Sequence, residues 1–530
     1  MSTRREFLSG TGAALAALSA PGFMPSTALA DLPPPWNPIE AKPRLAEAYR
    51  KRIRAASSYL ASRPVKQRFN LDEINHPSYI GQFHKTLPHD ANGLVSPADY
   101  EAMATACRAG DFALLESVPQ ASGKLANPLG AVAFANEGWD SHHLMVEAAS
   151  SIDSPTHGAE MAECYWLALT RDVSFDDYPV DPLVRRAVDD LVSLPGFEWV
   201  TPNNVFRGRL PGDAIGPYLS QFLLLDIPYG PMIVPQRICM PVPGNNWMTS
   251  YAEWLAVQNG GVAGSITHES TFRYIANGAS LAEFVHGDFS YQAFLNAALI
   301  LLPYGASALD PGNPYRGSRR QDGFVTFGGP AILDLVVRAA RDALMAVWFQ
   351  KWQVHRKVRP EAYGGLVENT LNRGVPQHEN PTLLASAAPG AVYSRFGTYL
   401  LPMAYPEGSP THPSYPAGHA AISGACSTVL KAFFDESFVF PQPKIAGRGG
   451  FALEDWSGVP LTVGGELNKL ASNCTLARDT AGVHYRQDGV QGLMLGEQVA
   501  LALLREFRAL YPEPFEGFRL TTFGGKVITV

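Results

Sequence analysis

Helical periodicity over long stretches is the feature that most constrains the fold of this chain. Apolar residues recur at helical spacing in Pro330–Arg356, with Pro330 near the expected first turn. The same periodicity occurs in Leu45–Ser62, Ala159–Leu169, Asp213–Asp226, Leu281–Leu302, Ala420–Phe434 and Gly489–Tyr511. The alternating pattern typical of strands is rare. We therefore predict a mainly α fold in which helices pack as bundles.

Long segments rich in proline and glycine separate the predicted helices. They include Pro228–Asn246, Pro303–Gly328 and Asn369–Pro416, and loops of this length in a compact domain are usually functional. There is no internal repeat and no obvious linker. The sequence predicts a single domain over residues 31–530 with long loops laid over its helices, and a weaker alternative places a boundary near residue 320.

The first 30 residues have the pattern of a targeting segment. Arg4-Arg5 precedes a run of small and apolar residues that ends at Ala28-Leu29-Ala30. This is typical of a twin-arginine signal peptide with a small-residue cleavage site, and the alternative is a surface helix that carries two arginines. We expect a mature chain of residues 31–530, exported in the folded state and periplasmic or secreted.

Composition argues against several classes of partner. The 530-residue chain has a net charge of −7 and no long block of lysine and arginine, so nucleic acid is not an expected partner. No later stretch reaches the roughly 18–20 unbroken apolar residues of a membrane span, so we expect no stable membrane insertion. The five cysteines form no CxxC motif and no Cys/His cluster, which excludes zinc fingers and thioredoxin-like motifs.

Two short segments in the last third of the chain combine basic residues with a predicted helix start. Lys351 and Arg359 lie eight residues apart, and Pro360 disfavours helical geometry at Arg359, so the arginine is expected where a helix ends. Gly418-His419 precedes the predicted helix Ala420–Phe434. The free backbone N–H groups at such a helix start favour an anion.

A third segment contains Arg478, His484 and Asp488. Asp488 follows His484 by four residues, one helical turn, which places it to hold the imidazole by a hydrogen bond. Each of the three segments alone is more commonly a solvated helix end, a polar cap or an ordinary ion pair. Together they supply three cations, a backbone donor and two imidazoles. That set suits a tetrahedral oxyanion, and phosphate and vanadate are the two biological oxyanions that fit.

The three segments resemble the three-part signature shared by vanadium-dependent haloperoxidases and the type 2 phosphatidic-acid-phosphatase/acid-phosphatase superfamily. Seven residues separate Lys351 from Arg359, where the common signature has six, and this spacing is similar to that of the marine algal bromoperoxidases. The chain is also similar to those enzymes in four short segments, KWQVHR, RPEA, SPTHPSYPAGHA and GVHYRQDG. A weaker sequence similarity extends upstream to Asn127–His143 and Phe284–Leu302. The resemblance implies a helical-bundle fold whose oxyanion-site core spans about residues 330–511.

The resemblance also implies a role for each matching residue. Three cations would bind the equatorial oxygens of vanadate(V), namely Lys351, Arg359 and Arg478, and the lysine would also polarise peroxide. Gly418 would donate its backbone N–H, and His484 would coordinate vanadium as the metal ligand, with Asp488 as its hydrogen-bond partner. His419 would be the acid/base that deprotonates hydrogen peroxide.

Three further positions bear on halide choice and efficiency. His412 matches a histidine of the bromoperoxidases where fungal-type chloroperoxidases carry Phe, which favours bromide and iodide over chloride. Trp348 matches a halide-pocket position, and a core aromatic on the helical stripe is an equally good interpretation. Ala417 stands where the family usually has Ser, whose hydroxyl bonds a vanadate oxygen. Its loss costs about 1.5–3 kcal/mol unless a water molecule replaces it.

The sequence thus predicts a vanadate-dependent haloperoxidase that oxidises bromide or iodide with hydrogen peroxide to hypohalous acid, which halogenates organic acceptors. Phosphate is expected to occupy the site when vanadate is absent. One alternative is a phosphomonoesterase with His484 as nucleophile and His419 as general acid. A second alternative, kept open by Ala417, is a specialised homologue without halide oxidation. Likeness to the algal enzymes implies a homo-oligomer, and we expect a dimer.

Overall fold

The computed structural model describes residues 41–62 and 65–530, and these two ranges belong to two separate compact units. In the first unit the described structure is helix α2 (Ala41–Leu60), which matches the periodicity expected over Leu45–Ser62. The expected signal peptide lies outside the described residues.

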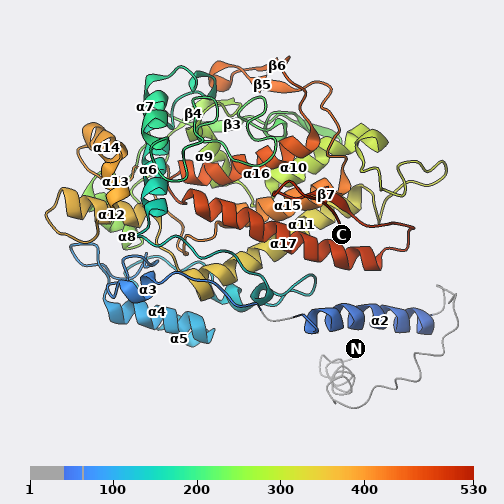
Figure 1. Cartoon of the computed structure of the whole chain (residues 1–530), viewed down its shortest axis with the longest axis horizontal. Coiled ribbons are helices and arrows are strands. Elements are labelled where there is room, and N and C mark those ends of the chain that lie inside the picture. Colours follow the sequence, from blue (N-terminus) through green and yellow to red (C-terminus); the bar gives the residue numbers. More distant parts are fainter. Residues whose placement is uncertain (1–40, 63–64) are drawn as a thin grey trace, which may run out of the picture. The chain divides into compact units, whose positions relative to one another are not determined.

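The second unit consists mainly of helices (Figure 1), and the predicted mainly α fold is confirmed. Its α-helices in the first part of the unit are α3 (Asp72–Asn75), α4 (Pro97–Ala109), α5 (Phe112–Glu116), α6 (Pro155–Thr170), α7 (Pro182–Leu191), α8 (Tyr251–Gln258), α9 (Gly278–Gly287) and α10 (Gln292–Leu301). The later α-helices are α11 (Gly329–Phe349), α12 (Pro360–Leu371), α13 (Pro381–Ala385), α14 (Ala388–Phe396), α15 (Gly418–Phe433), α16 (Val463–Thr480) and α17 (Arg486–Leu510).

Short helical turns and small sheets complete the second unit. The 3-10 turns are η1 (Pro128–Val132), η2 (Ser141–His143), η3 (Phe175–Asp177), η4 (Gln221–Leu223), η5 (Leu302–Ala308) and η7 (Arg448–Gly450), and η6 (Gln350–His355) is a π-helical turn. The strands form four antiparallel pairs: β1 (Ile227–Tyr229) with β2 (Met232–Val234), β3 (Ile238–Pro241) with β4 (His268–Arg273), β5 (Lys444–Ala446) with β6 (Leu453–Asp455), and β7 (Arg519–Thr521) with β8 (Val527–Thr529). The β3–β4 register shifts between Cys239 and Pro241.

Helix α15 lies at the centre of the larger apolar core and packs against α11, α16 and α17 (Figure 1). Small residues let α15 and α17 approach closely. A Cβ added at Gly492 of α17 would lie 2.6 Å from the Ala420 Cβ, and one at Gly496 would lie 2.6 Å from the Ala425 backbone nitrogen. Because interiors are packed without spare volume, this contact fixes the start of α15 relative to α17.

A second apolar cluster is built mainly from α6, α7, α8 and α12, and it also contains the connection between α16 and α17. Ala477 belongs to the first cluster, whereas Ala481, Val483 and Tyr485 belong to the second. The segment that carries Arg478 and His484 therefore lies at the border between the two cores.

Three expected helices differ from the observed ones. The Pro330–Arg356 stretch forms α11 and then changes to the π-helical turn η6, which ends at Arg356 in the left-handed region (φ 43°). The helix expected over Asp213–Asp226 is wrong: Gly216 has φ +71° and precedes Pro217, and only the short turn η4 forms. The stretch Leu281–Leu302 breaks between α9 and α10, where Asp288 is extended.

Among the described residues, the structure contains no helix that is both long and apolar enough to cross a membrane.

Candidate active site

Three buried cations come from three different elements of the second unit. Lys351 lies in the π-helical turn η6, Arg359 is the N-cap residue of α12, and Arg478 lies in the last turn of α16. Their exposed fractions are 0%, 2% and 6%, respectively. Burial of three positive groups is unfavourable unless something compensates their charge.

Backbone carbonyls hold the Lys351 ammonium in place. Its Nζ donates hydrogen bonds to the carbonyl oxygens of Pro413 (2.7 Å) and Ser414 (2.6 Å). Burial, followed by the nearby positive charge of Arg359, lowers the pKa of Lys351 well below its usual range. An ammonium has three N–H donors, so one remains for a ligand after these two bonds.

The Arg359 guanidinium joins the other segments of the site. It donates to the carbonyl oxygens of His412 (Nε, 3.0 Å) and Val483 (Nη1, 2.7 Å), and its Nη1 also lies 3.0 Å from His484 Nε2. Burial lowers the pKa of Arg359 to about 9, although Asp488 acts in the opposite direction. Arg359 therefore connects the segments around His412 and His484, which lie far apart in the sequence.

Arg478 is the third cation of the site, and not all of its N–H groups form hydrogen bonds with the described residues. Its Nη1 donates to the Val285 carbonyl oxygen at 2.9 Å and to the Tyr405 hydroxyl at 3.4 Å, and the guanidinium lies 5.4 Å from the Tyr405 ring centroid. Its Nε is buried without a hydrogen-bond partner among the described residues. A buried unsatisfied donor costs free energy that a bound acceptor would recover.

Within the described part of the chain, none of these three cations forms an ion pair with a carboxylate. Other buried cations do, as in the pairs Lys85–Glu361, Lys469–Glu466 and Arg486–Glu163. Carbonyl oxygens position the three cations but carry no full charge, and the nearby Asp488 carboxylate offsets only part of the charge of the cations, so the site keeps an excess of positive charge. This donor set fits a buried oxyanion such as vanadate or phosphate.

His484 has a defined tautomer because its two ring nitrogens face different partners. Nδ1 lies 2.9 Å from Asp488 Oδ2, an acceptor that also bonds the Ser414 hydroxyl, whereas Nε2 faces the Arg359 guanidinium, which can only donate. The proton therefore lies on Nδ1 and the lone pair on Nε2. Burial, followed by Arg359 and Lys351, lowers the pKa of His484 well below its usual range. The neutral ring thus presents its Nε2 lone pair to the cations, with Arg359 Nη1 3.0 Å away.

The start of α15 supplies backbone donors and a second imidazole. Gly418 is the first residue of the helix, and its N-cap residue Ala417 has no side-chain acceptor for the N–H groups of the first turn. These groups are therefore available to an anion. His419 follows, with Nε2 2.9 Å from the buried Asp288 Oδ1. The carboxylate favours a proton on Nε2 and leaves Nδ1 to accept another.

His412 and Trp348 lie together beside the same site. Their rings are 4.7 Å apart, and Arg359 Nη2 lies 3.0 Å from His412 Nδ1. Burial and the nearby cations lower the pKa of His412 well below its usual range. Trp348 donates to the Ala126 carbonyl at 3.2 Å and would lie 3.6 Å from a Cβ on Gly418. Its ring also packs against the main core, so Trp348 is both a core aromatic and a neighbour of the site.

Ala417 is 1% exposed and belongs to a small apolar cluster. The other buried members of that cluster are Ala420, Ala471, Leu493 and Phe523. The Ala417 backbone N–H donates to the Asp488 carbonyl at 2.8 Å, which ties the start of α15 to the start of α17. A larger side chain at this position would have to fit beside that cluster.

The structure brings the predicted residues into one region, and it adds three that the sequence did not reveal. Asp288 contacts His419, Ser414 contacts Asp488, and Tyr405 contacts Arg478. Asp288 and Ser414 lie inside segments that resemble the bromoperoxidases, which is the signal that could have found them. For Tyr405 we find no such signal in the sequence.

This chain is similar to known proteins both in its sequence and in its fold. Residues 332–512 match the model of the VCPO second helical-bundle domain. The chain is 34% identical to the vanadium-dependent bromoperoxidase of Corallina pilulifera, over 86% of this chain and 91% of that protein. It is also 34% identical to the vanadium-dependent bromoperoxidase of Ascophyllum nodosum, over 93% of each chain.

The fold agrees with a solved structure over nearly its full length. The homohexameric structure of the second vanadate-dependent bromoperoxidase from Ascophyllum nodosum superimposes with a TM-score of 0.86 and 30% sequence identity, covering 95% of each chain. The likeness therefore extends over the site segments and over the helices that position them.

Proposed function

Because the chain belongs to the vanadium-dependent bromoperoxidases, we propose that it is a vanadate-dependent haloperoxidase, which oxidises bromide or iodide with hydrogen peroxide and so halogenates organic acceptors. The observation that best supports the proposal is the group of buried cations, which form no ion pair with a carboxylate of the described residues and lie next to the His484 Nε2 lone pair. This arrangement provides both charge and a ligand atom for a metal oxyanion.

The residues that would hold vanadate divide into charge, backbone and ligand donors. The charged donors are Lys351, Arg359 and Arg478. They would neutralise the oxyanion through the N–H groups that remain after their contacts with carbonyl oxygens and, for Arg359, with two imidazole nitrogens. Gly418 would add its backbone N–H at the start of α15. His484 would offer Nε2, while Asp488 fixes the ring by accepting from Nδ1. Bound vanadate would supply a Lewis-acidic centre at which hydrogen peroxide becomes reactive toward halide.

His419 would move the proton of hydrogen peroxide. Its Nε2 is engaged by Asp288, so Nδ1 is the nitrogen that would take the proton. The hydrogen bond to Asp288 would hold the ring in a fixed orientation while Nδ1 takes the proton. The ring would later return the proton as a general acid.

His412 and Trp348 would shape the halide position. The two rings lie together next to Arg359 and Gly418. The polar imidazole at position 412 supports bromide and iodide as the halides. The identity of the halide is testable by comparing turnover with iodide, bromide and chloride on the same preparation.

The same donors suit phosphate, so phosphate should compete with vanadate for the site. A phosphomonoesterase with His484 as nucleophile would use this pocket differently, and Ala417 keeps a specialised homologue without halide oxidation as a further candidate. Parallel assays distinguish the three. Vanadate-loaded protein should brominate an organic acceptor with hydrogen peroxide, and phosphate-loaded protein should hydrolyse phosphomonoesters poorly. Hydrolysis without bromination would favour the phosphatase. The absence of both reactions would favour the specialised homologue.

Export and assembly form a second part of the proposal. The twin-arginine pattern at Arg4-Arg5 supports export of the folded protein to the periplasm or beyond. The second vanadate-dependent bromoperoxidase from Ascophyllum nodosum is homohexameric. This supports a homo-oligomer for the present chain, for which the sequence predicts a dimer. Light scattering on the purified mature protein measures the assembly, and N-terminal sequencing of exported protein locates the cleavage site.

A further inference from the structure

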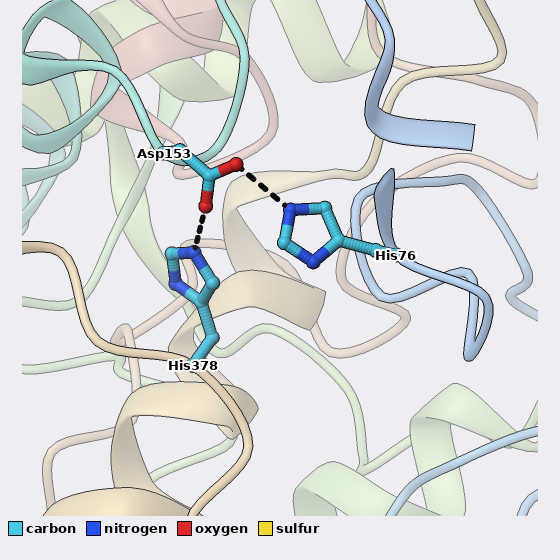
Figure 2. Close-up of side chains that lie close together, drawn as sticks. All are labelled: His76, Asp153 and His378. Atoms are coloured by element: carbon cyan, nitrogen blue, oxygen red, sulfur yellow. Dashed lines mark hydrogen bonds and ion pairs between the residues drawn. The ribbon is translucent and has the colours of Figure 1, made fainter. Parts of the chain in front are cut away.

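Two histidines and an aspartate from three separate segments meet outside the oxyanion site (Figure 2). Asp153 lies between the rings: its Oδ2 is 3.0 Å from His76 Nε2 and its Oδ1 is 3.0 Å from His378 Nε2. One ligand atom from each of the three residues can be chosen so that all three lie within 4.8 Å of one another. His76 directly follows α3, Asp153 precedes α6, and His378 lies between α12 and α13.

The three side chains form a donor set that suits a transition metal. Two imidazole nitrogens and one carboxylate are ligands for Zn²⁺ and its first-row neighbours, whereas Mg²⁺ and Ca²⁺ prefer oxygen ligands alone. In a tetrahedral zinc site with bonds of about 2.0–2.1 Å, ligand atoms lie about 3.3 Å apart. The two N···O spacings of 3.0 Å are already close to this value, and the remaining spacing, between the two imidazole nitrogens, is at most 4.8 Å. The Asp153 side chain is 52% exposed, which leaves a path for a cation and for a water ligand.

His378 is oriented as metal-binding histidines usually are. Its Nδ1 lies 3.0 Å from the Tyr363 hydroxyl on α12, and its side chain is only 5% exposed. A hydrogen bond at the second ring nitrogen fixes the ring and directs the first nitrogen toward a metal. The Tyr363 hydroxyl oxygen is able to accept a hydrogen bond from Nδ1–H. In that tautomer the Nε2 lone pair is available to a cation.

The backbone around Asp153 is held from both sides by residues close to the two histidines. Asp72, four residues before His76, accepts a hydrogen bond from the Ile152 N–H at 3.1 Å. Asn380, two residues after His378, donates to the carbonyl oxygens of Ile152 and Ser154, both at 2.9 Å. Each histidine segment is thus tied to the aspartate segment independently of the three ligand side chains. The ligands are therefore preorganised rather than loosely gathered.

A second group of histidines and carboxylates provides a contrast. Glu283 contacts two histidines, with 2.7 Å to His268 Nε2 but 3.7 Å to His286 Nδ1. His286 directs its Nε2 to Glu407 instead, at 2.7 Å. There the ring nitrogens pair with different carboxylates and do not meet at one point. The group around Asp153 differs because both Nε2 atoms face the same carboxylate.

We propose that His76, Asp153 and His378 form a binding site for one divalent first-row transition cation, with Zn²⁺ as the expected occupant. The ion would tie the segment after α3 to the start of α6 and to the connection between α12 and α13. Its role would be structural, since it would replace two hydrogen bonds with three metal–ligand bonds and stabilise only the folded state.

The test is a zinc titration of the full mature chain after treatment with EDTA. Calorimetry on the wild type, on Asp153→Asn and on His378→Gln measures how many equivalents bind and how tightly. His268→Gln is the matched control, because it removes a histidine that bonds one carboxylate outside the proposed site. Other imidazoles contribute equally to the wild type and the variants, so the difference isolates this site.

We expect the wild type and His268→Gln to bind one more zinc ion than Asp153→Asn or His378→Gln, or to bind it at least about tenfold more tightly. Zinc should raise the melting temperature of the first two proteins and leave the other two unchanged, and Mg²⁺ should have no effect. Circular dichroism confirms that each variant is folded, and either variant alone suffices if the other does not fold. Equal zinc binding and equal thermal stabilisation in all four proteins would overturn the proposal.

Discussion

At the scale of single residues, the two histidines of the oxyanion site have different partners and therefore different expected roles. His484 is held by Asp488 and presents Nε2 to the cations, whereas His419 is held by Asp288 at the start of α15. His484→Ala should weaken vanadate binding by about 100-fold or more, because it removes a ligand and not only a supporting partner. His419→Ala should keep vanadate binding within a few fold and slow bromination by about 10²–10⁴-fold.

Equilibrium dialysis with vanadate and a bromination assay separate these two effects. His268→Ala is the control, since its ring bonds Glu283 and none of the site residues. Retention of full activity in both His484→Ala and His419→Ala would show that the site is assigned wrongly. Loss of vanadate binding in His419→Ala alone would mean that His419 is the vanadium ligand and His484 the acid/base.

The alanine at position 417 gives a second prediction at this scale. Ala417→Ser adds a hydroxyl at the N-cap of α15, where Ser is a preferred residue and where it would also meet a bound oxyanion. If the missing donor limits the enzyme, the change should tighten vanadate binding or raise bromide turnover by up to about 1.5–3 kcal/mol in free energy. If water fills this role, the effect should be near zero. Vanadate affinity and turnover at saturating vanadate are the measurements.

A clear loss of affinity and turnover in Ala417→Ser would have a different meaning. Ala417 packs in an apolar cluster with Leu493 and Phe523. The loss would show that this packing requires alanine, and it would favour the specialised homologue over ordinary halide oxidation.

At the scale of elements, the contact between α15 and α17 positions the start of α15. A Cβ at Gly496 would collide with the Ala421 carbonyl oxygen and lie 2.6 Å from the Ala425 nitrogen, so the two helices would have to separate. Gly496→Ala should therefore lower the free energy of unfolding by about 1–3 kcal/mol. It should also weaken vanadate binding, because α15 carries Gly418. Thermal melts and vanadate titrations measure the two effects.

Gly390 offers a matched control for this substitution. It lies in helix α14, and a Cβ there would meet nothing within 4 Å. Gly390→Ala should therefore be neutral or slightly stabilising, since alanine favours helices. Equal melting temperatures for Gly496→Ala and Gly390→Ala would contradict the account of the helix contact.

The end of helix α9 should make stability depend on pH. His286 is partly buried, which disfavours its charged form, but Glu283 and Glu407 outweigh this effect and raise its pKa to about 9. A raised folded-state pKa stabilises the fold fully below the unfolded value of about 6.5, and this stabilisation is lost as pH rises through about 9. His286→Gln should thus destabilise the protein by about 1 kcal/mol at pH 6 and by almost nothing at pH 10.

Melting temperatures of the wild type and His286→Gln between pH 6 and pH 10 measure this dependence. Both carboxylate partners have pKa values held below the usual range, in spite of partial burial, so they stay charged throughout this interval. A difference between the two proteins that stays constant with pH would show that His286 contributes packing and not charge.

The sequence predicted the elements with strong apolar periodicity and missed features that depend on tertiary contacts. Helices α11 and α17 follow from their patterns, since burial of one face determines such helices, whereas α15 follows from a mostly apolar run that is buried on all sides. The π-helical turn η6 has no local pattern of its own, although it sets the direction of Lys351. The helix expected over Asp213–Asp226 fails because Gly216-Pro217 interrupts it, a local signal that the periodicity outweighed.

The site shows the same division between local motif and distant contact. Lys351, His419 and Arg478 stand in motifs that the sequence displays directly. The pairing of His419 with Asp288 joins residues 131 positions apart, and no spacing rule predicts such a contact. The carbonyl oxygens that position the three cations also come from distant segments, and no local motif predicts these contacts.

At the scale of the whole molecule, the oxyanion site exists only when two apolar cores meet. Arg478 and His484 lie at the border between the cores, and Arg359 bonds segments that are more than 50 and more than 120 residues away. A partly folded chain would therefore lack the site. Vanadate should stabilise the folded protein in proportion to its binding, because it binds only the assembled arrangement.

The vanadate dependence of bromination tests the central claim most directly. The mature protein is stripped of vanadate, and the rate of bromination with hydrogen peroxide is measured as orthovanadate is added in sub-equivalent steps. The account predicts no activity at the start, a rise that ends at one vanadate per chain, and inhibition of this rise by phosphate. Activity that does not depend on vanadate, or that returns with iron or zinc instead, would contradict the account.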